Sequence, residues 1–236
     1  MAYALPGLYD ALYASKDYAG ESARITELIR ARSPEARTLL DVACGTGRHL
    51  EYLRADFDVE GVDVDEGLLA VARERLGSTA LSLGDMRTLA LGRRFDAITC
   101  LFSAIGHLAD TSELDTAIAA MAAHLEPGGV LLVEPWIEPD AWLPGKPALL
   151  TVDEPELKIA RVTLTGRRGN TSILHFHYLV ATPDGVETFE ERMELGLFTA
   201  AELRSAFERA GLDVEHDPDG LTGRGLFSGR SPAAGS

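Results

Sequence analysis

The sequence predicts an α/β fold in which a mostly parallel, seven-stranded sheet is interrupted by an antiparallel insertion. Strand-like and helix-like segments alternate from Leu39 to Glu134, which is typical of a doubly wound parallel sheet. After Pro135 the helical pattern stops and three strand-like runs follow one another, separated by turn signals. We therefore expect an α/β domain over residues 1–135 and 198–230, with an antiparallel β-subdomain over residues 136–197.

The elements before the insertion follow from apolar spacing and from the residues that end each pattern. A helix is expected where apolar residues recur every three or four positions, and a strand where they alternate or form a short buried run. Helices are predicted at 19–32, 48–54, 66–76 and 112–124, and strands at 39–42, 57–63, 79–83, 95–102 and 130–134. We expect Glu126-Pro127-Gly128-Gly129 to cap the helix at 112–124.

The insertion and the segments after it follow from the same signals. Its strands are predicted at 157–165, 172–181 and 186–197. A helix is expected at 199–210, because Thr199 and Glu202 have the spacing of a capping box. Two strands at 212–216 and 225–229 would complete the fold, and residues 231–236 are predicted to be disordered.

Composition narrows the possible functions. Lys and Arg number 22 and Asp and Glu number 37, so the formal net charge is −15, which opposes binding to a nucleic-acid backbone. The pairs Arg93-Arg94 and Arg167-Arg168 are interpreted as solvated loop charges. There is no apolar run of membrane-spanning length and no signal-peptide pattern at the start, so we expect a cytoplasmic protein with no membrane partner. The two cysteines, Cys44 and Cys100, favour reduced thiols over a disulfide.

The segment Thr38 to His49 predicts a cofactor site, because an apolar strand leads into a glycine-rich turn and then a helix. A phosphate-binding P-loop would need a lysine after its last glycine, where this chain has Arg48. A dinucleotide site would need a third glycine where Leu50 stands. Asp63 follows Gly45 by 18 positions, close to the spacing of about 20 at which an acid binds an adenosine ribose.

The pattern Asp41-x-Ala43-x-Gly45-x-Gly47 resembles the signature of class I S-adenosylmethionine-dependent methyltransferases, with alanine at the first glycine. The resemblance implies that the turn holds the amino-acid end of S-adenosylmethionine and that Asp63 holds the ribose. It also implies that Asp85 lies near the adenine amine and Met86 against the ring. The expected cofactor contacts are Tyr18, Asp41, Ala43, Cys44, Gly45, Asp63, Val64, Asp85, Met86, Arg87, Leu101 and Phe102.

Further motifs narrow the resemblance. The chain contains D-V-A-C-G-T-G, G-D-M-R, I-G-H-L, H-L-E-P-G-G-V, V-E-P-W and G-R-G-L-F in that order. It is similar in this to the N,N-dimethyltransferases that act on nucleotide-linked amino sugars in desosamine and mycaminose biosynthesis. The resemblance implies a Rossmann-like fold, a small-molecule substrate and in-line methyl transfer to the sugar amine. Ala104 and the segment 141–157 depart from the family pattern, so the identity of the sugar stays open.

The residues expected at the acceptor site follow from position and chemistry. His107 follows a predicted strand at the sheet edge where ligands bind, and its side chain titrates near neutrality, so we expect it to act as the base or to orient the amine. Glu134, at the end of the fifth strand, is expected to hold the ammonium or a hydroxyl. Arg224 stands between two glycines and could bind a phosphate bidentately. The expected substrate contacts are Tyr9, Tyr13, Ser103, Trp136, Arg161, His177 and Arg224, with residues 1–18 as a lid.

Other interpretations stay open on the sequence alone. His107 could contact only sugar hydroxyls, Arg224 could face solvent, and the tyrosines near the N-terminus could simply pack. The acceptor could be another small natural-product amine or hydroxyl, or the protein could bind the cofactor without catalysis. His175 and His177 share a strand face but have no third ligand nearby, so no metal site is expected. An exposed apolar outer face on the insertion would favour a homodimer.

Overall fold

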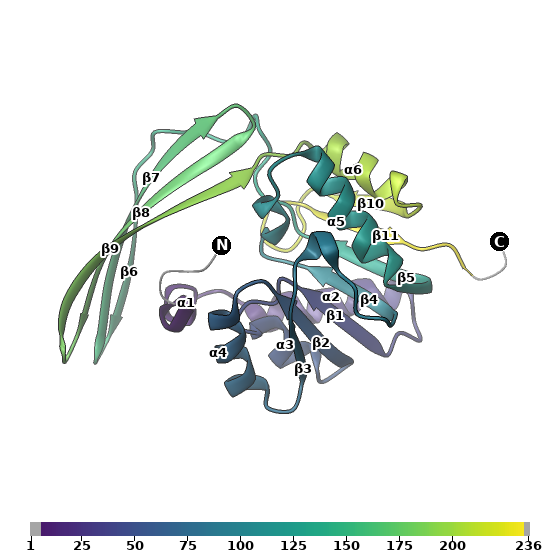
Figure 1. Cartoon of the computed structure of the whole chain (residues 1–236), viewed down its shortest axis with the longest axis horizontal. Coiled ribbons are helices and arrows are strands. Elements are labelled where there is room, and N and C mark those ends of the chain that lie inside the picture. The colour runs from purple at the N-terminus through teal and green to yellow at the C-terminus, as the bar shows by residue number, and fades with distance from the viewer. Residues whose placement is uncertain (1–5, 234–236) are drawn as a thin grey trace.

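The chain forms two β-sheets that lie side by side in a computed structural model describing residues 6–233 (Figure 1). The larger sheet contains β1 (Thr38–Val42), β2 (Asp58–Asp63), β3 (Ala80–Leu83), β4 (Phe95–Cys100), β5 (Leu125–Val133), β10 (Asp213–Asp217) and β11 (Leu226–Arg230). Its strand order is β10-β11-β5-β4-β1-β2-β3, and every neighbouring pair is parallel except the two that involve β11.

The smaller sheet is an antiparallel meander inserted between β5 and β10. It contains β6 (Ala148–Glu154), β7 (Leu157–Arg168), β8 (Thr171–Thr182) and β9 (Gly185–Gly196), in that order across the sheet. The predicted fold class, a mostly parallel sheet with an antiparallel insertion, is confirmed. All four inserted strands lie within residues 136–197.

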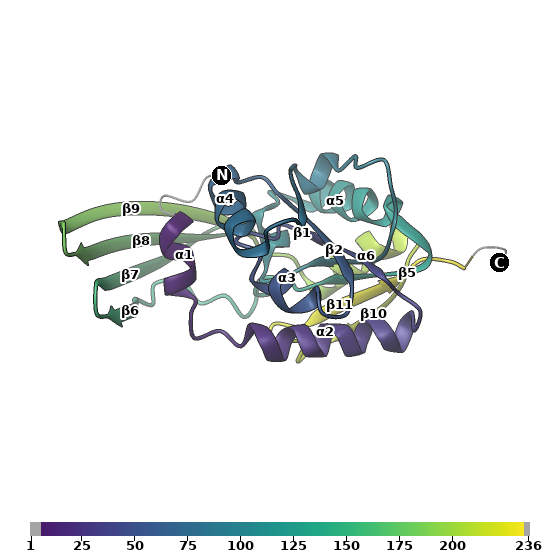
Figure 2. The ribbon, with the colours of Figure 1, turned by 90° about the horizontal axis from the view of Figure 1, so that it is seen from below.

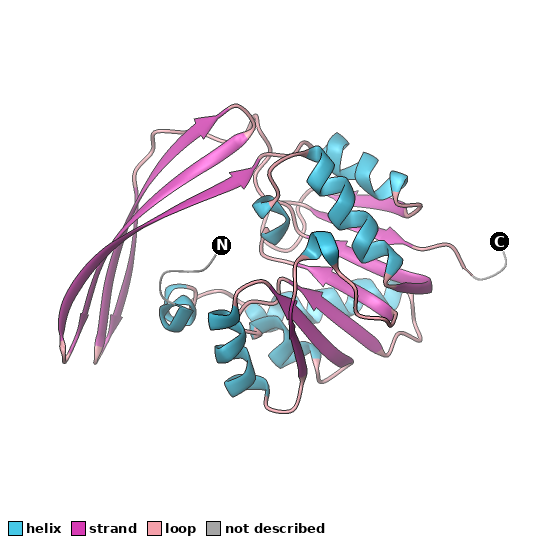
Figure 3. Ribbon diagram, viewed as in Figure 1, coloured by secondary structure: helices cyan, strands magenta, loops and turns pink. Residues whose placement is uncertain are grey.

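Helices cover both faces of the larger sheet (Figures 2 and 3). On one face lie α2 (Tyr18–Arg32), α3 (Arg48–Leu53) and α4 (Glu66–Leu76), and on the other lie α5 (Thr111–Ala123) and α6 (Ala200–Arg209). The predicted capping box begins α6: Thr199 accepts the Glu202 N–H, and the Glu202 carboxylate accepts the Thr199 N–H. No helix within the described residues is long and apolar enough to cross a membrane.

Side-chain alternation explains why the larger sheet is buried on both faces. Leu39 packs with α2, α3 and α4, whereas the next residue, Leu40, packs with α5 and α6. In β5, Val130 and Leu132 join the first cluster, and Leu131 and Val133 join the second. A strand buried on both sides therefore appears in the sequence as a continuous apolar run.

A short helix, α1 (Pro6–Leu12), lies between the smaller sheet and α4 (Figures 1 and 2). Its Leu8 and Leu12 pack against the apolar cluster on the inner face of the smaller sheet. The predicted lid over residues 1–18 thus corresponds to α1 and the segment that leads to α2, and residues 1–5 fall outside the described chain.

Three predictions about local structure were wrong. Strand β6 was not predicted, and Glu126-Pro127-Gly128-Gly129 belongs to β5, so that His124 is the C-cap of α5. The predicted disorder over residues 231–236 was wrong for Ser231 and Pro232, and residues 234–236 lie outside the described chain. The Ser231 N–H donates to the Gly129 carbonyl, and the Pro232 carbonyl accepts the Gly128 N–H, so these residues continue the pairing with β5.

Candidate functional site

A cavity of about 550 Å³ lies where the carboxyl ends of β1, β2 and β4 face the smaller sheet. This volume lies in the range of roughly 300–1,000 Å³ that is typical of small-molecule sites. Its walls come from α1, from the loops after the parallel strands and from the inner face of β7, β8 and β9. The sheet edge is the one at which ligands bind in open α/β folds.

The glycine turn after β1 presents its backbone to this cavity. Gly45 has a φ of +55°, and a Cβ added there would meet no atom within 4 Å, so the main chain is open to a ligand. At Gly47, with φ of +75°, a Cβ would lie 2.6 Å from Leu76 Cδ1, so glycine allows the turn to pack on α4. Ala43 also has a positive φ, 60°, a conformation that costs about 1–2 kcal/mol in a residue with a side chain.

Two acids at the carboxyl ends of β2 and β3 line one end of the cavity. Asp63 Oδ2 accepts the Gly45 N–H at 2.7 Å, and its Oδ1 accepts the Asp65 N–H at 2.9 Å. Burial raises the pKa of Asp63, although these hydrogen bonds oppose the effect. Asp85 is ion-paired with Arg87, whose hydrogen bonds lower the pKa of Asp85. Val64 and Met86, beside these two acids, supply apolar surface to the same cavity.

The loop after β4 forms the middle of the cavity. Phe102 and Ser103 have φ values of 50° and 63°, so two consecutive residues with side chains are left-handed. This turn leads into a short 3₁₀ helix, η2 (Ala104–His107), that carries His107 to the cavity. The imidazole reaches solvent through the cavity, yet the surrounding walls desolvate it enough to lower the pKa of His107. We expect a neutral imidazole at neutral pH, which can accept a proton.

Arg224 enters the cavity from the loop between β10 and β11. Its Nη1 donates to the Ser103 hydroxyl at 3.0 Å, and its guanidinium lies 5.1 Å from the Trp136 ring and 5.7 Å from the Phe102 ring. The Trp136 indole is held in place by a bond from its Nε1 to Ser172 Oγ. A guanidinium stacked in this way keeps donors available for a further anion.

A second arginine, Arg161 on β7, reaches the cavity near the lid. Its Nη1 donates to the Tyr13 hydroxyl at 3.2 Å, and its guanidinium lies 4.8 Å from the Phe176 ring. The Tyr13 ring meets Phe102 edge to face, with 5.1 Å between centroids. Arg161 Nε is buried and has no hydrogen-bond partner in the part of the chain that the structure describes. Such a donor favours an anionic or carbonyl ligand.

Most of the predicted site residues meet in this cavity, although they come from distant parts of the sequence. The predicted residues that line it are Tyr9, Tyr13, Ala43, Gly45, Asp63, Val64, Asp85, Met86, Arg87, Leu101, Phe102, Ser103, His107, Trp136, Arg161 and Arg224.

Three of the predicted cofactor contacts do not reach the cavity. Asp41 is 2% exposed and accepts the Thr99 hydroxyl at 2.7 Å inside the sheet. Cys44 is buried with Leu39 and Leu50 in one apolar core, and both cysteines are free. Tyr18, 5% exposed, packs at the start of α2 with its ring 5.0 Å from that of His49. None of these three side chains lines the cavity.

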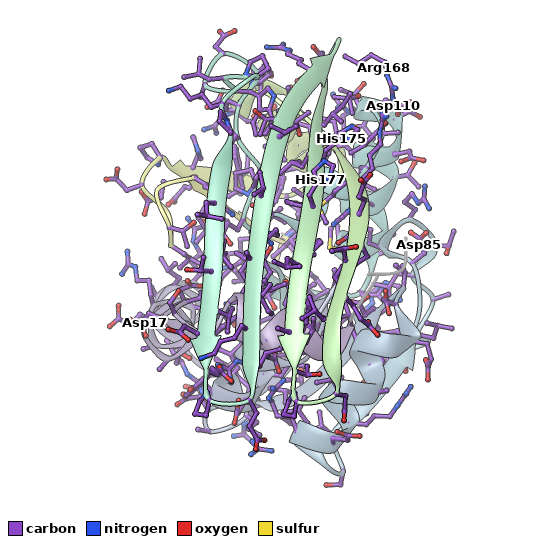
Figure 4. All side chains as sticks on the ribbon, turned by 90° about the vertical axis from the view of Figure 1, so that its left-hand side faces the viewer. Asp17, Asp85, Asp110, Arg168, His175 and His177 are labelled. Carbon is purple, nitrogen blue, oxygen red and sulfur yellow. The ribbon has the colours of Figure 1, made fainter. Side chains whose placement is uncertain are left out.

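Two predicted acceptor contacts also lie elsewhere. Glu134 is 0% exposed and uses both carboxylate oxygens on other parts of the protein, Phe102 and Thr222. His177 lies on the outer face of the smaller sheet, as Figure 4 shows, and its Nδ1 is 3.2 Å from Glu190 Oε1. The reason is the strand register: Arg161 pairs with Tyr178, so Tyr178 faces inward and its neighbour His177 faces outward.

The predictions omitted the inward side chains of the smaller sheet. Alternate residues in the middle of β7 and near the start of β8 contribute to the cavity, together with Trp142 and part of β9. The omitted lining residues from the inserted segment are Trp142, Ala148, Thr163, Thr165, Leu174, Phe176, Met193, Glu194 and Leu195, and those from the larger domain are Asp65, Leu68, Gly84, Ala104 and Leu108. Once Arg161 is placed inward, the two-residue period of a strand identifies Thr163 and Thr165 as well.

No group of three or more metal-binding side chains occurs among residues 6–233. His175 and His177 share the outer face of β8 without a third ligand (Figure 4).

The cavity and the two sheets match known methyltransferases. Residues 39–129 match a family model described as a methyltransferase domain. Over 232 residues, 97% of this chain and 91% of the relative, the sequence is 47% identical to a dTDP-3-amino-3,6-dideoxy-alpha-D-glucopyranose N,N-dimethyltransferase from Streptomyces fradiae. This chain belongs to the family of nucleotide-linked amino-sugar N,N-dimethyltransferases. As a member of the class I methyltransferases, it uses S-adenosylmethionine as its methyl donor.

Solved structures agree with this family. The structure of DesVI from Streptomyces venezuelae superposes with a TM-score of 0.91 at 44% identity, covering 96% of this chain and 97% of that one. CalS10 from Micromonospora echinaspora, an amino pentose methyltransferase solved with bound S-adenosylmethionine, gives a TM-score of 0.87 at 41% identity, covering 94% and 96%. The family similarity therefore extends through the inserted sheet as well as the cofactor domain.

Proposed function

We propose that this methyltransferase transfers two methyl groups in succession to the amine of a dTDP-linked amino-deoxysugar. The observation that carries the proposal is the placement of Arg161 and Arg224 in one cavity of a protein whose net charge is −15. A substrate that carries a nucleoside diphosphate offers these two guanidinium groups an anionic ligand in an otherwise acidic molecule. The relative from Streptomyces fradiae acts on a 3-amino sugar, so an amine at the third carbon is the first candidate.

The residues around the glycine turn fit S-adenosylmethionine. Gly45 leaves room for its amino-acid end against the main chain, Asp63 can accept hydrogen bonds from the ribose hydroxyls, and Asp85 can accept one from the adenine amine. Met86 and Val64 provide apolar surface for the ring. When bound, the cofactor supplies an electrophilic methyl group on a positively charged sulfur.

The residues of the acceptor half then have separate roles. His107 receives a proton from the amine, because a free sugar amine is largely protonated at neutral pH and needs a neutral lone pair to react. Trp136 gives the sugar an apolar wall, and Arg224 binds the diphosphate. Holding the amine and the methyl carbon in line within the cavity can supply up to about 7–11 kcal/mol of the acceleration.

The test is a set of methylation assays with nucleotide-linked amino sugars. The purified protein, S-adenosylmethionine and dTDP-linked 3-amino and 4-amino sugars are incubated, and the products are analysed by mass spectrometry. Two successive gains of one methyl mass on a 3-amino sugar are expected. A gain on the 4-amino sugar alone would correct the position. Methylation of other small amines or hydroxyls, with none of any amino sugar, would contradict the proposed substrate, and failure to bind the cofactor in calorimetry would contradict catalysis itself.

We also propose that the smaller sheet has two roles and that the enzyme is a cytoplasmic homodimer. The inner face of the sheet lines the acceptor half of the cavity. Its outer face carries exposed apolar side chains, among them Leu149 at 68%, Leu164 at 49% and Leu179 at 49% exposure. An apolar sheet face of this kind supports association with a second copy of the same face.

A further inference from the structure

The Glu134 carboxylate is buried and does not line the cavity, yet it contacts two loops that do. It follows β5, is 0% exposed, and its backbone N–H donates to the Cys100 carbonyl. Its Oε2 accepts the Phe102 N–H at 2.7 Å, and its Oε1 accepts the Thr222 hydroxyl at 2.5 Å. One carboxylate thus joins the turn after β4 to the loop between β10 and β11.

The first of these loops is held in an unfavourable conformation. Phe102 and Ser103 both have positive φ values, which residues with side chains rarely adopt. The bond from the Phe102 N–H to Glu134 and the bond from the Ser103 hydroxyl to the Pro135 carbonyl, at 2.8 Å, fix this turn to the end of β5. The turn needs such anchors because the chain would otherwise relax toward negative φ.

The second loop carries Arg224, two positions after Thr222. Gly223 between them has a φ of +79°, so the loop reverses there, and the Gly223 N–H donates to the Asp219 carbonyl. Thr222 therefore fastens the loop to Glu134 next to the guanidinium that meets Ser103 and Trp136. The two loops meet at Glu134 and again at the bond between Arg224 and Ser103.

We propose that Glu134 is a positioning residue that sets the Arg224 loop and the Phe102–Ser103 turn relative to each other. The diphosphate-binding group and a wall of the cofactor pocket are then placed by the same buried carboxylate. The inference rests on the proposed function for the ligand of Arg224 only. It replaces the direct contact with substrate that the sequence predicted for Glu134.

The decisive variants separate the hydrogen bond of Glu134 to Phe102 from its hydrogen bond to Thr222. Glu134→Gln should keep both contacts, because the amide oxygen can accept the Phe102 N–H while the amide nitrogen donates to the Thr222 hydroxyl. Thr222→Val removes only the loop contact, and Glu134→Ala removes both. Thr116→Val, which deletes a hydroxyl bonded to Ser112 on α5, is the control for a threonine far from the cavity.

The measurements are the dissociation constants of dTDP and S-adenosylhomocysteine by calorimetry, followed by kcat and KM. Thr222→Val should weaken dTDP about tenfold, the effect of losing a hydrogen bond to a charged group, and leave S-adenosylhomocysteine within about twofold. Glu134→Ala should weaken both, and Glu134→Gln and Thr116→Val should stay near wild type. An unchanged dTDP affinity in Thr222→Val would overturn the proposal. So would a Glu134→Gln variant that binds both ligands normally but no longer turns over, because the carboxylate would then act on the substrate.

Hydrogen exchange keeps the test independent of the substrate. Exchange over residues 218–225 should accelerate in Thr222→Val, while residues 101–104 should accelerate only in Glu134→Ala. If the wild type does not bind dTDP, the proposed substrate fails, and this exchange pattern still decides whether Glu134 positions both loops. If Glu134→Ala does not fold, Thr222→Val and Glu134→Gln still decide it.

Discussion

The Asp10 carboxylate of α1 accepts a hydrogen bond of 2.7 Å from the Thr46 hydroxyl in the glycine turn. Its second oxygen is ion-paired with Arg75 of α4, which also donates to the Thr46 carbonyl. Thr46 is only 2% exposed, so this network is partly shielded from water. The short helix that carries Tyr9 to the cavity is therefore attached to the turn expected to hold the cofactor.

We expect Asp10→Ala to weaken the binding of S-adenosylhomocysteine and of dTDP without unfolding the protein. The variant releases α1 from the glycine turn and from Arg75, and two charge-assisted contacts of this kind together correspond to roughly tenfold in affinity. Calorimetry with S-adenosylhomocysteine and dTDP measures the change. Glu27→Ala, which breaks an exposed ion pair with Arg24, is the matched control. Unaltered affinities in Asp10→Ala would show that α1 does not depend on this network.

A second prediction concerns stability and pH. Burial raises the pKa of Asp41 to about 6, whereas an unfolded chain has an aspartate near 3.9. Between these values the native state binds more protons than the unfolded state, so the free energy of unfolding falls as pH rises from about 4 to 6. Asp41→Asn should remove part of this slope and stabilise the free protein at pH 7.5 by about 1–3 kcal/mol. Urea unfolding at a series of pH values measures it.

Asp96 provides a control for the urea experiment, because its pKa is lowered in the folded protein whereas that of Asp41 is raised. Although burial opposes the effect, hydrogen bonds from Arg37 N and from Thr38 lower the pKa of Asp96. Its contribution to stability is present above the unfolded pKa and is lost as pH falls. Asp96→Asn should therefore lower the free energy of unfolding at pH 7.5. Equal slopes in wild type and Asp41→Asn would contradict the raised pKa of Asp41.

A third prediction concerns His107 as the base. Because desolvation lowers the pKa of His107 in the free enzyme, its acidic limb in the pH profile of kcat/KM should lie below the ordinary histidine value of about 6.5. His107→Ala should lower kcat by about 100-fold or more and remove this limb. His175→Ala, on the outer face of β8 (Figure 4), is the control and should retain the profile. A reduced kcat with the same limb would mean that His107 only positions the amine.

Local sequence patterns predicted the larger sheet well because each strand there is bounded by its own turn and helix signals. Strand β6 was missed for a physical reason. Leu150 and Val152 face the inner cluster or its edge, while Leu149 on the other face is also apolar and 68% exposed. With apolar residues on both faces, the alternation that marks a half-buried strand disappears.

The sequence predicted correctly the site residues that lie at strand ends. It predicted less well the residues whose position depends on contacts with distant parts of the chain or on the register between strands. Asp63 ends β2 and Asp85 comes two residues after β3, so their position could be inferred from the alternation alone. Glu134 has the same kind of position, but its partner Thr222 lies 88 residues later. Whether His177 faces inward or outward depends on the register between β7 and β8. A shift of that register by one residue would turn His177 to the other face of the sheet.

The proposed dimer gives the last prediction. Leu179 lies on the outer face of β8, paired with Ala160 of β7 and Thr188 of β9, and is 49% exposed. A charge at this position would have to be buried against a second copy, so Leu179→Glu should convert the dimer to a monomer. Sedimentation velocity should give twice the chain mass of 25.4 kDa for wild type and that mass for the variant. Tyr52→Glu, which alters an exposed apolar side chain on α3, should remain a dimer, and the affinity for S-adenosylhomocysteine should not change in either variant.

A wild type that sediments at the mass of one chain would refute the dimer, and a Leu179→Glu variant that stays dimeric would place the interface on another surface.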